Sequence, residues 1–252
     1  MKESIKTAKP YLTVFPEPSS VFVSPIDQYV KHLHALLSID LSAVNSEWHG
    51  KIHLIAPVEP YEGFIGEYTQ HAHNEFLKPN WIAFRLTEDS KYELLGDFKY
   101  FVLENDDLKE PFSGFLSDLH KHYTQNHLGL IEAKERFAKF GELYGDKGES
   151  LEEKKQYYGE SFNLIDQLGG EIGFANWTNY CDEFGIKLNI ASESDPNADD
   201  DVFPISPAGN RFYFIAGVPE WHYITNGYSG ADWIVLYYEP IERIAWLTFD
   251  YS

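Results

Sequence analysis

Three pairs of histidines, each pair separated by one residue, are the side chains whose types and spacing could bind a metal ion. Side chains two residues apart share a face on a β-strand but diverge on a helix. The pairs are His32/His34, His71/His73 and His120/His122. The first and third pairs lie in helical patterns, so we do not expect the two members of either pair to act together.

The pair His71 and His73 lies in a segment whose secondary structure the sequence leaves open. On a strand the two imidazoles would share a face, and Glu67 or Glu75 could join them in a mixed site that suits zinc. The alternative is that both are surface histidines on a loop or an edge strand. A zinc site built from His71, His73 and Glu75 is therefore a hypothesis, and no other cofactor is expected.

The segment Asp195–Asp201 places oxygen-bearing side chains at alternate positions, as a calcium-binding loop does. The glycine expected at the sixth position is Asp200, however, and the glutamate expected at the twelfth is Ser206. The sequence therefore favours a solvated acidic loop. Asp199, Asp200 and Asp201 are then candidates for an acidic contact surface.

Cys181 is the only cysteine, which rules out a disulfide within the chain and a zinc site made of cysteines. Its neighbours Asp182 and Glu183 oppose thiolate formation, so a small buried side chain is expected. The chain carries no Gly-x-Ser-x-Gly elbow, phosphate-binding loop or dinucleotide fingerprint. No catalytic residue is predicted.

The aromatic run Trp221, His222 and Tyr223 follows Gly217-Val-Pro-Glu and could line a groove for a sugar or a peptide. Core packing is the alternative for these three side chains.

Acidic residues outnumber basic ones by 40 to 20, which gives a formal net charge of −20. Nucleic acid is an unfavourable partner for such a chain, because phosphate binding needs clustered Lys and Arg. Residues 188–252 hold ten Asp or Glu against Arg211 and Arg243. This region would repel anionic membranes and attract a basic protein partner. The alternative is that the acidity serves solubility.

No apolar run approaches the roughly 20 residues of a membrane span, and the first residues lack the apolar core of a signal peptide. Together with the single cysteine, this favours a cytoplasmic location.

The longest helical pattern begins at Ser113 and continues to Tyr144, as one kinked helix or a helical hairpin. Another helix is expected from Ser24, because apolar residues recur at helical spacing from Ile26 to Leu37. Ser150 can cap a further short helix.

Strands are expected where β-branched and aromatic residues gather. They are residues 51–57, 81–86, 98–103, 211–216, 233–238 and 243–249. Only four residues separate the last two, which predicts a hairpin. Apolar residues on both sides of the C-terminal strands indicate a sheet covered on both faces.

These patterns predict an α+β fold of mainly antiparallel sheets with helices packed on their faces. The expected organisation is an N-terminal α+β region, residues 1–147, and a β-rich region, residues 148–252. One continuous domain is the alternative.

Three segments in the second region resemble a known family. They are Leu168–Phe174 with Asn176-Trp177, Gly209–Ile215, and Gly230–Glu239. Together they resemble the YwqG-like family of uncharacterised bacterial proteins over roughly residues 160–240, although Glu171-Ile172 stands where the family has a proline. The resemblance implies an α+β fold and a bacterial cytosolic origin, and it supplies no catalytic residues. Members encoded beside toxin systems suggest a binding role.

The favoured function is a non-enzymatic protein-binding factor, of immunity or regulatory type, with an acidic contact surface. One alternative is a metal- or carboxylate-dependent hydrolase that uses His71 and His73. Another is a glycan or small-molecule binder that uses Trp221 and Tyr223.

Overall fold

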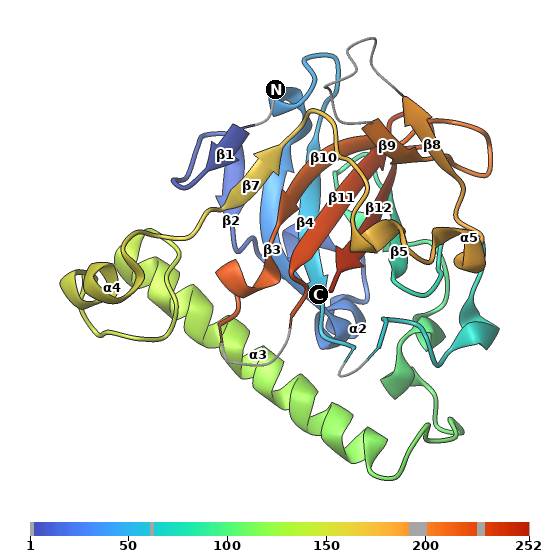
Figure 1. Ribbon diagram of the computed structural model, residues 1–252, viewed down its shortest axis with the longest axis horizontal. Helices are drawn as coiled ribbons and strands as arrows, with labels where there is room; N and C mark the ends of the chain where they lie inside the picture. Colours follow the sequence, from blue (N-terminus) through green and yellow to red (C-terminus); the bar gives the residue numbers. More distant parts are fainter. Residues whose placement is uncertain (1–2, 61–62, 192–200, 226–229, 252) are drawn as a thin grey trace.

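A seven-stranded antiparallel sheet forms the centre of the computed structural model, which describes residues 3–60, 63–191, 201–225 and 230–251 (Figure 1). In spatial order its strands are β1 (Glu3–Ile5), β7 (Ile165–Leu168), β10 (Tyr213–Val218), β11 (Trp233–Glu239), β12 (Ile244–Asp250), β5 (Trp81–Leu86) and β6 (Tyr92–Leu94).

Two smaller antiparallel sheets accompany it. The first has the order β2 (Leu12–Val14), β3 (Leu33–Asp40) and β4 (Lys51–Pro57), and the second pairs β8 (Leu188–Ala191) with β9 (Asp201–Pro204).

The central strands are buried on both faces, as β11 illustrates. Because successive side chains on a strand point to opposite faces, Ile234 and Leu236 join the main core with residues of the three-stranded sheet. Val235 and Tyr237 join a second core on the other face, with Trp177 and Cys181. The expectation of a sheet covered on both faces is confirmed.

The helices lie around these sheets. They are α1 (Pro18–Val21), α2 (Ile26–His32), α3 (Phe115–Phe140), α4 (Leu151–Tyr158) and α5 (Cys181–Phe184). Short 3-10 turns are η1 (Leu41–Ala43), η2 (Gln70–Ala72), η3 (Phe98–Tyr100), η4 (Val102–Glu104), η5 (Asn176–Thr178) and η6 (Glu220–His222). The long helix α3 runs diagonally past the lower end of the sheets, with α4 beside its C-terminal end (Figure 1). Its buried Leu119 and Tyr123 pack with Val58 and Val102.

The α+β class with antiparallel sheets is confirmed, as are the predicted strands at 51–57 and 81–86 and the β11–β12 hairpin. The long helix forms as one continuous element that passes through Gly129. Ser150 caps α4 in a reciprocal capping box with Glu153, as its position predicted. Among the described residues, no helix combines the length and apolar character needed to cross a membrane.

Two predicted elements are wrong. The helix expected from Ser24 to Leu37 ends at His32, and the chain continues as β3. The run 33–39 is apolar at five of its seven positions, so it fits a strand buried on both faces as well as a helix. The strand expected at 98–103 forms η3 and η4 instead. The Asp97 carboxylate accepts a hydrogen bond from the Lys99 amide and starts the first turn.

Candidate functional site

The predicted metal residues do not share a face. His71 and His73 lie on and directly after η2, a 3-10 turn rather than the strand that a shared site would use. His71 Nε2 lies 2.9 Å from Asn105 Oδ1, whereas His73 Nε2 lies 2.8 Å from the Gly66 carbonyl oxygen. Glu75 is exposed. Within the described ranges, no group of three or more His, Cys, Asp or Glu side chains is placed to hold a metal.

The predicted aromatic run divides between surface and core. Trp221 is 45% exposed, whereas His222 and Tyr223 are buried. The Tyr223 hydroxyl donates to the Leu164 carbonyl at 2.6 Å, and the His222 ring stacks on Phe162 at 5.2 Å. Only Trp221 of the three therefore has a side chain that a ligand could reach at the surface.

Part of the C-terminal acidity lies inside the protein. Asp201 is buried and paired with Arg211, while Asp199 and Asp200 lie outside the described residues. Glu220 is also buried, which raises its pKa to about 7, and it accepts a hydrogen bond from the Ala231 amide. Because Asp201 and Glu220 are buried and bonded within the fold, these two carboxylates cannot contribute to an acidic contact surface.

A cleft of about 590 Å³ brings aromatic rings and carboxylates together. We call it the aromatic cleft and define it by Phe64, Tyr180, Phe184, Glu67 and Glu183. The Phe64 ring meets those of Tyr180 and Phe184 edge-on, at centroid distances of 5.4 and 5.9 Å. Tyr180 is 48% exposed and Glu183 is exposed, so both reach solvent.

The turn that carries Phe64 and Glu67, and the helix α5 that carries Phe184, are each held in place by local contacts. Glu67 Oε2 accepts a hydrogen bond from the Phe64 amide at 2.9 Å, which closes the turn that carries both side chains. Gly66 in this turn has φ +77°, and a Cβ there would lie 2.3 Å from the Tyr100 ring, so glycine is required. On the opposite wall, Cys181 anchors α5 in the core. Burial raises the pKa of its thiol to about 12, as expected for an inert buried cysteine.

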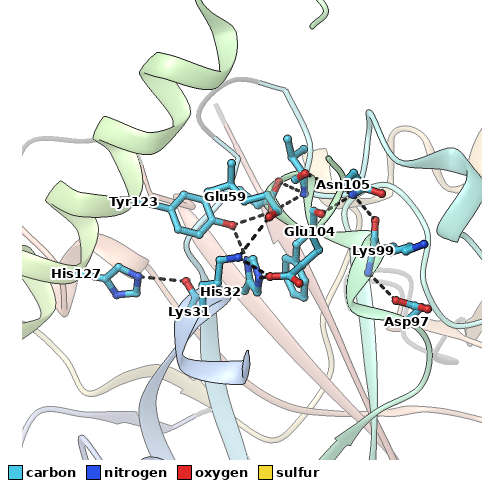
Figure 2. A network of polar contacts seen from close by, with 12 residues as sticks. Lys31, His32, Glu59, Asp97, Lys99, Glu104, Asn105, Tyr123 and His127 are labelled. Atoms are coloured by element: carbon cyan, nitrogen blue, oxygen red, sulfur yellow. Dashed lines mark hydrogen bonds and ion pairs between the residues drawn. The ribbon is translucent and has the colours of Figure 1, made fainter. Parts of the chain in front are cut away.

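A chain of polar groups, buried except at Glu104, joins α2, α3 and η4 (Figure 2). Glu59 follows β4, and its Oε1 lies 2.9 Å from the Tyr123 hydroxyl. That hydroxyl lies 2.8 Å from His32 Nδ1, and His32 Nε2 lies 2.8 Å from Glu104 Oε1. We call Glu59, Tyr123, His32 and Glu104 the buried chain.

Burial sets the protonation of the buried chain. It raises the pKa of Glu59 to about 7 and lowers that of His32 to about 4. Burial also acts to raise the pKa of Glu104, but hydrogen bonds from Lys31 and His32 outweigh it, and the net direction is down. A neutral imidazole thus stands between one carboxyl that tends to hold its proton and one carboxylate that is ionised.

The Glu104 end of the chain opens on a second cleft, of about 370 Å³, which Lys99, Asn105 and Asp106 also line. His71 lies here as well, whereas His73 faces the aromatic cleft. The structure therefore separates two histidines that the sequence paired.

Sequence motifs do not reveal the buried chain, because its members are far apart in the sequence. A signal existed at Glu59, a lone acid between Val58 and Pro60 at the end of an apolar strand. His122 and Tyr123 on the apolar stripe of α3 were another. Neither signal names the partners, which come together only through packing.

No family model, no curated protein and no solved structure matches this chain. Its function has to be inferred from the residues themselves.

Proposed function

We propose that this protein is a non-enzymatic binding factor of immunity or regulatory type, which holds a lysine or arginine side chain of a basic protein partner in the aromatic cleft. The observation that carries the proposal is the meeting of three aromatic rings and two carboxylates around one cleft. Aromatic faces attract cations, and they also pack against the aliphatic stem of Lys or Arg. A cytoplasmic location belongs to the same proposal.

The charges around the cleft favour a cation. Glu67 and Glu183 contribute −2 and Lys78 contributes +1, while burial lowers the pKa of His73 and leaves it neutral at pH 7, so the formal local charge is −2 + 1 = −1. The net charge of −20 extends this preference to the whole molecule and would accelerate encounter with a basic partner.

Binding of a lysine-rich peptide, measured by isothermal titration calorimetry, tests the proposal. The double variant Tyr180→Ala/Glu183→Gln removes one ring and one carboxylate of the cleft. We expect it to weaken binding about tenfold, since a cation–π contact and a charge pair contribute roughly 0.5–1 kcal/mol each.

The matched control is Tyr157→Ala/Glu152→Gln on α4, where both side chains are exposed and the change in net charge is the same. This control should bind as the wild type does. Equal weakening by the two double variants would show that general charge attraction holds the peptide and would refute a role for the cleft.

A carboxylate-dependent hydrolase is the second candidate, and one observation favours it. Glu104 ends a buried chain that can exchange protons and reaches a cleft large enough for a small substrate. A hydrolase substrate panel that shows turnover abolished by Glu104→Gln would support this function over the first, and no turnover by the wild type would reject it.

A further inference from the structure

The buried chain contains more acceptors than a fully ionised state could satisfy. Glu59 and Glu104 are carboxyls at its two ends, and neutral His32 can donate through only one of its ring nitrogens. Three of the four groups are closed off from water, because Glu59 is 2%, His32 0% and Tyr123 5% exposed, whereas the Glu104 side chain is 21% exposed at the second cleft. A hydrogen missing from this chain therefore leaves two acceptors facing each other in a largely buried site.

We infer that Glu59, Tyr123, His32 and Glu104 share one mobile proton, and that this proton latches the η3–η4 segment, residues 97–105, onto α2 and α3. This latch is separate from the aromatic cleft and does not depend on the proposed binding function.

Two arrangements satisfy every bond in the chain with the same number of protons. In one, Glu59 is protonated and donates to Tyr123, Tyr123 donates to His32 Nδ1, and His32 Nε2 donates to Glu104. In the other, His32 is an imidazolium that donates to Tyr123 and Glu104, and Tyr123 donates to ionised Glu59. The proton passes between them as the Tyr123 hydroxyl reverses. Tyr123 keeps its own proton because burial raises its pKa well above 10.

The surrounding charges fit this proton count. Lys31 donates to Glu104 at 2.5 Å and to the Leu103 carbonyl at 3.3 Å, so it neutralises the carboxylate at the open end. His127 and His122 on α3 both have lowered pKa values through burial and add no charge at neutral pH. The Tyr100 hydroxyl on η3 stays protonated for the same reason.

Loss of the proton weakens the attachment of the segment at Glu104. The proton leaves from the second arrangement, where His32 Nε2 gives its hydrogen to solvent at the Glu104 end. Ionised Glu59 keeps the hydrogen bond from Tyr123, Tyr123 accepts from His32 Nδ1, and His32 Nε2 then faces the Glu104 carboxylate without a hydrogen between them. The rest of the segment is still held by the Val102 amide, 3.0 Å from Glu59 Oε1, and by Lys31. The Thr69 hydroxyl, which donates to the Tyr100 carbonyl at 2.7 Å, and the buried Tyr100 and Phe101 rings also hold it, so the weakening is local to Glu104 and its neighbours. Because Glu104 and Asn105 line the second cleft, the wall of that cleft loosens.

The sign of the pH dependence follows from counting protons in the latched and opened forms. In the opened form, Glu59 and His32 have their ordinary pKa values of 4.5 and 6.5. In the latched form, the pKa of Glu59 is about 7 and that of His32 is about 4. Between pH 4.5 and 6.5 both forms hold one proton on this pair, so the latch is insensitive to pH. Above pH 6.5 the opened form loses that proton first, and the latch weakens by about threefold until the latched form loses the proton near pH 7.

The substitution Glu59→Gln fixes the first arrangement, because its amide nitrogen, in place of the Oε1 that faces Tyr123, always supplies a hydrogen to that hydroxyl. The remaining oxygen stands in place of Oε2, which accepts from the Val102 amide at 3.3 Å. Only His32 then titrates. The latch of the variant should strengthen about tenfold per pH unit from pH 5 to 6.5 and stay constant above, where the wild-type latch weakens.

Amide hydrogen exchange across residues 97–105, expressed as protection factors from pH 5 to 8.5, tests the inference. For the wild type we expect constant protection up to pH 6.5 and then a fall of about threefold. For Glu59→Gln we expect the rising profile, and for Tyr123→Phe low protection at every pH. Amides of β11 and β12 serve as the internal reference. Parallel profiles for wild type and Glu59→Gln would overturn the shared proton.

A second measurement uses the wild type alone and decides the matter even if a variant does not fold. The carboxyl carbon of Glu59, followed by NMR, should titrate near pH 7. Titration near its ordinary value of 4.5 would overturn the inference.

Discussion

At the scale of single residues, carboxylates in this acidic chain serve two different purposes. Some lie at the surface, but Glu59, Glu220 and Glu239 are buried and each accepts backbone hydrogen bonds. Composition alone could not separate the two groups, because burial depends on packing between elements distant in sequence. The sequence did place Cys181 in the core, since its acidic neighbours make it a poor nucleophile.

Glu239 illustrates the structural use of a carboxylate. It is fully buried and accepts hydrogen bonds from the amides of Ile241, at 2.8 Å, and Glu242, at 2.6 Å, in the β11–β12 turn. Glu239→Ala should lower the free energy of unfolding by about 1–3 kcal/mol, because both amides lose their acceptor. Urea denaturation measures this loss. The control Glu242→Ala removes an exposed acid of the same turn and should change it by less than about 0.5 kcal/mol. Equal effects would contradict the assignment.

At the scale of elements, the sequence predicted those with strong local signals. The long helix, the β11–β12 hairpin and the cap of α4 were all predicted, because periodicity, short connections and capping chemistry act within a few residues. Strand β3 was not, since its apolar run satisfies both helix and strand and its pairing with β2 and β4 decides between them. The two clefts were not predicted either, because Phe64 and Tyr180 meet only in the folded chain.

The capping box of α4 gives a prediction at this scale. The Ser150 hydroxyl accepts from the Glu153 amide at 3.2 Å, and the Glu153 carboxylate accepts from the Ser150 amide at 3.1 Å. Ser150→Ala should destabilise α4 by about 1 kcal/mol, whereas Ser150→Asp should retain most of the cap. Hydrogen exchange of the α4 amides reports the difference. Unchanged exchange in Ser150→Ala would mean that tertiary contacts alone hold the helix.

At the scale of the whole molecule, the seven-stranded sheet unites distant parts of the chain. Strand β1 pairs with β7, and β12 pairs with β5, so strands from both sides of the expected boundary at 147/148 contribute to it. The main core likewise contains residues from Ile5 to Phe249. This arrangement favours the alternative of one continuous domain.

We therefore expect a single cooperative unfolding transition. Tryptophan fluorescence and far-ultraviolet circular dichroism, followed in the same urea titration, should give coincident curves. Two transitions, with one half of the chain unfolding before the other, would support separate regions at 1–147 and 148–252.

Entry of a cationic side chain into the aromatic cleft is the central event of the proposed function. The most direct measurement is a map of amide and side-chain NMR shifts during titration with a lysine-rich peptide, with the same peptide acetylated on its lysines as the control, because acetylation removes the charge and keeps the stem. We predict saturable shifts centred on Phe64, Tyr180 and Phe184 with the unmodified peptide and none with the acetylated one. Shifts centred on Trp221 or on α4, or equal shifts with both peptides, would contradict the proposal.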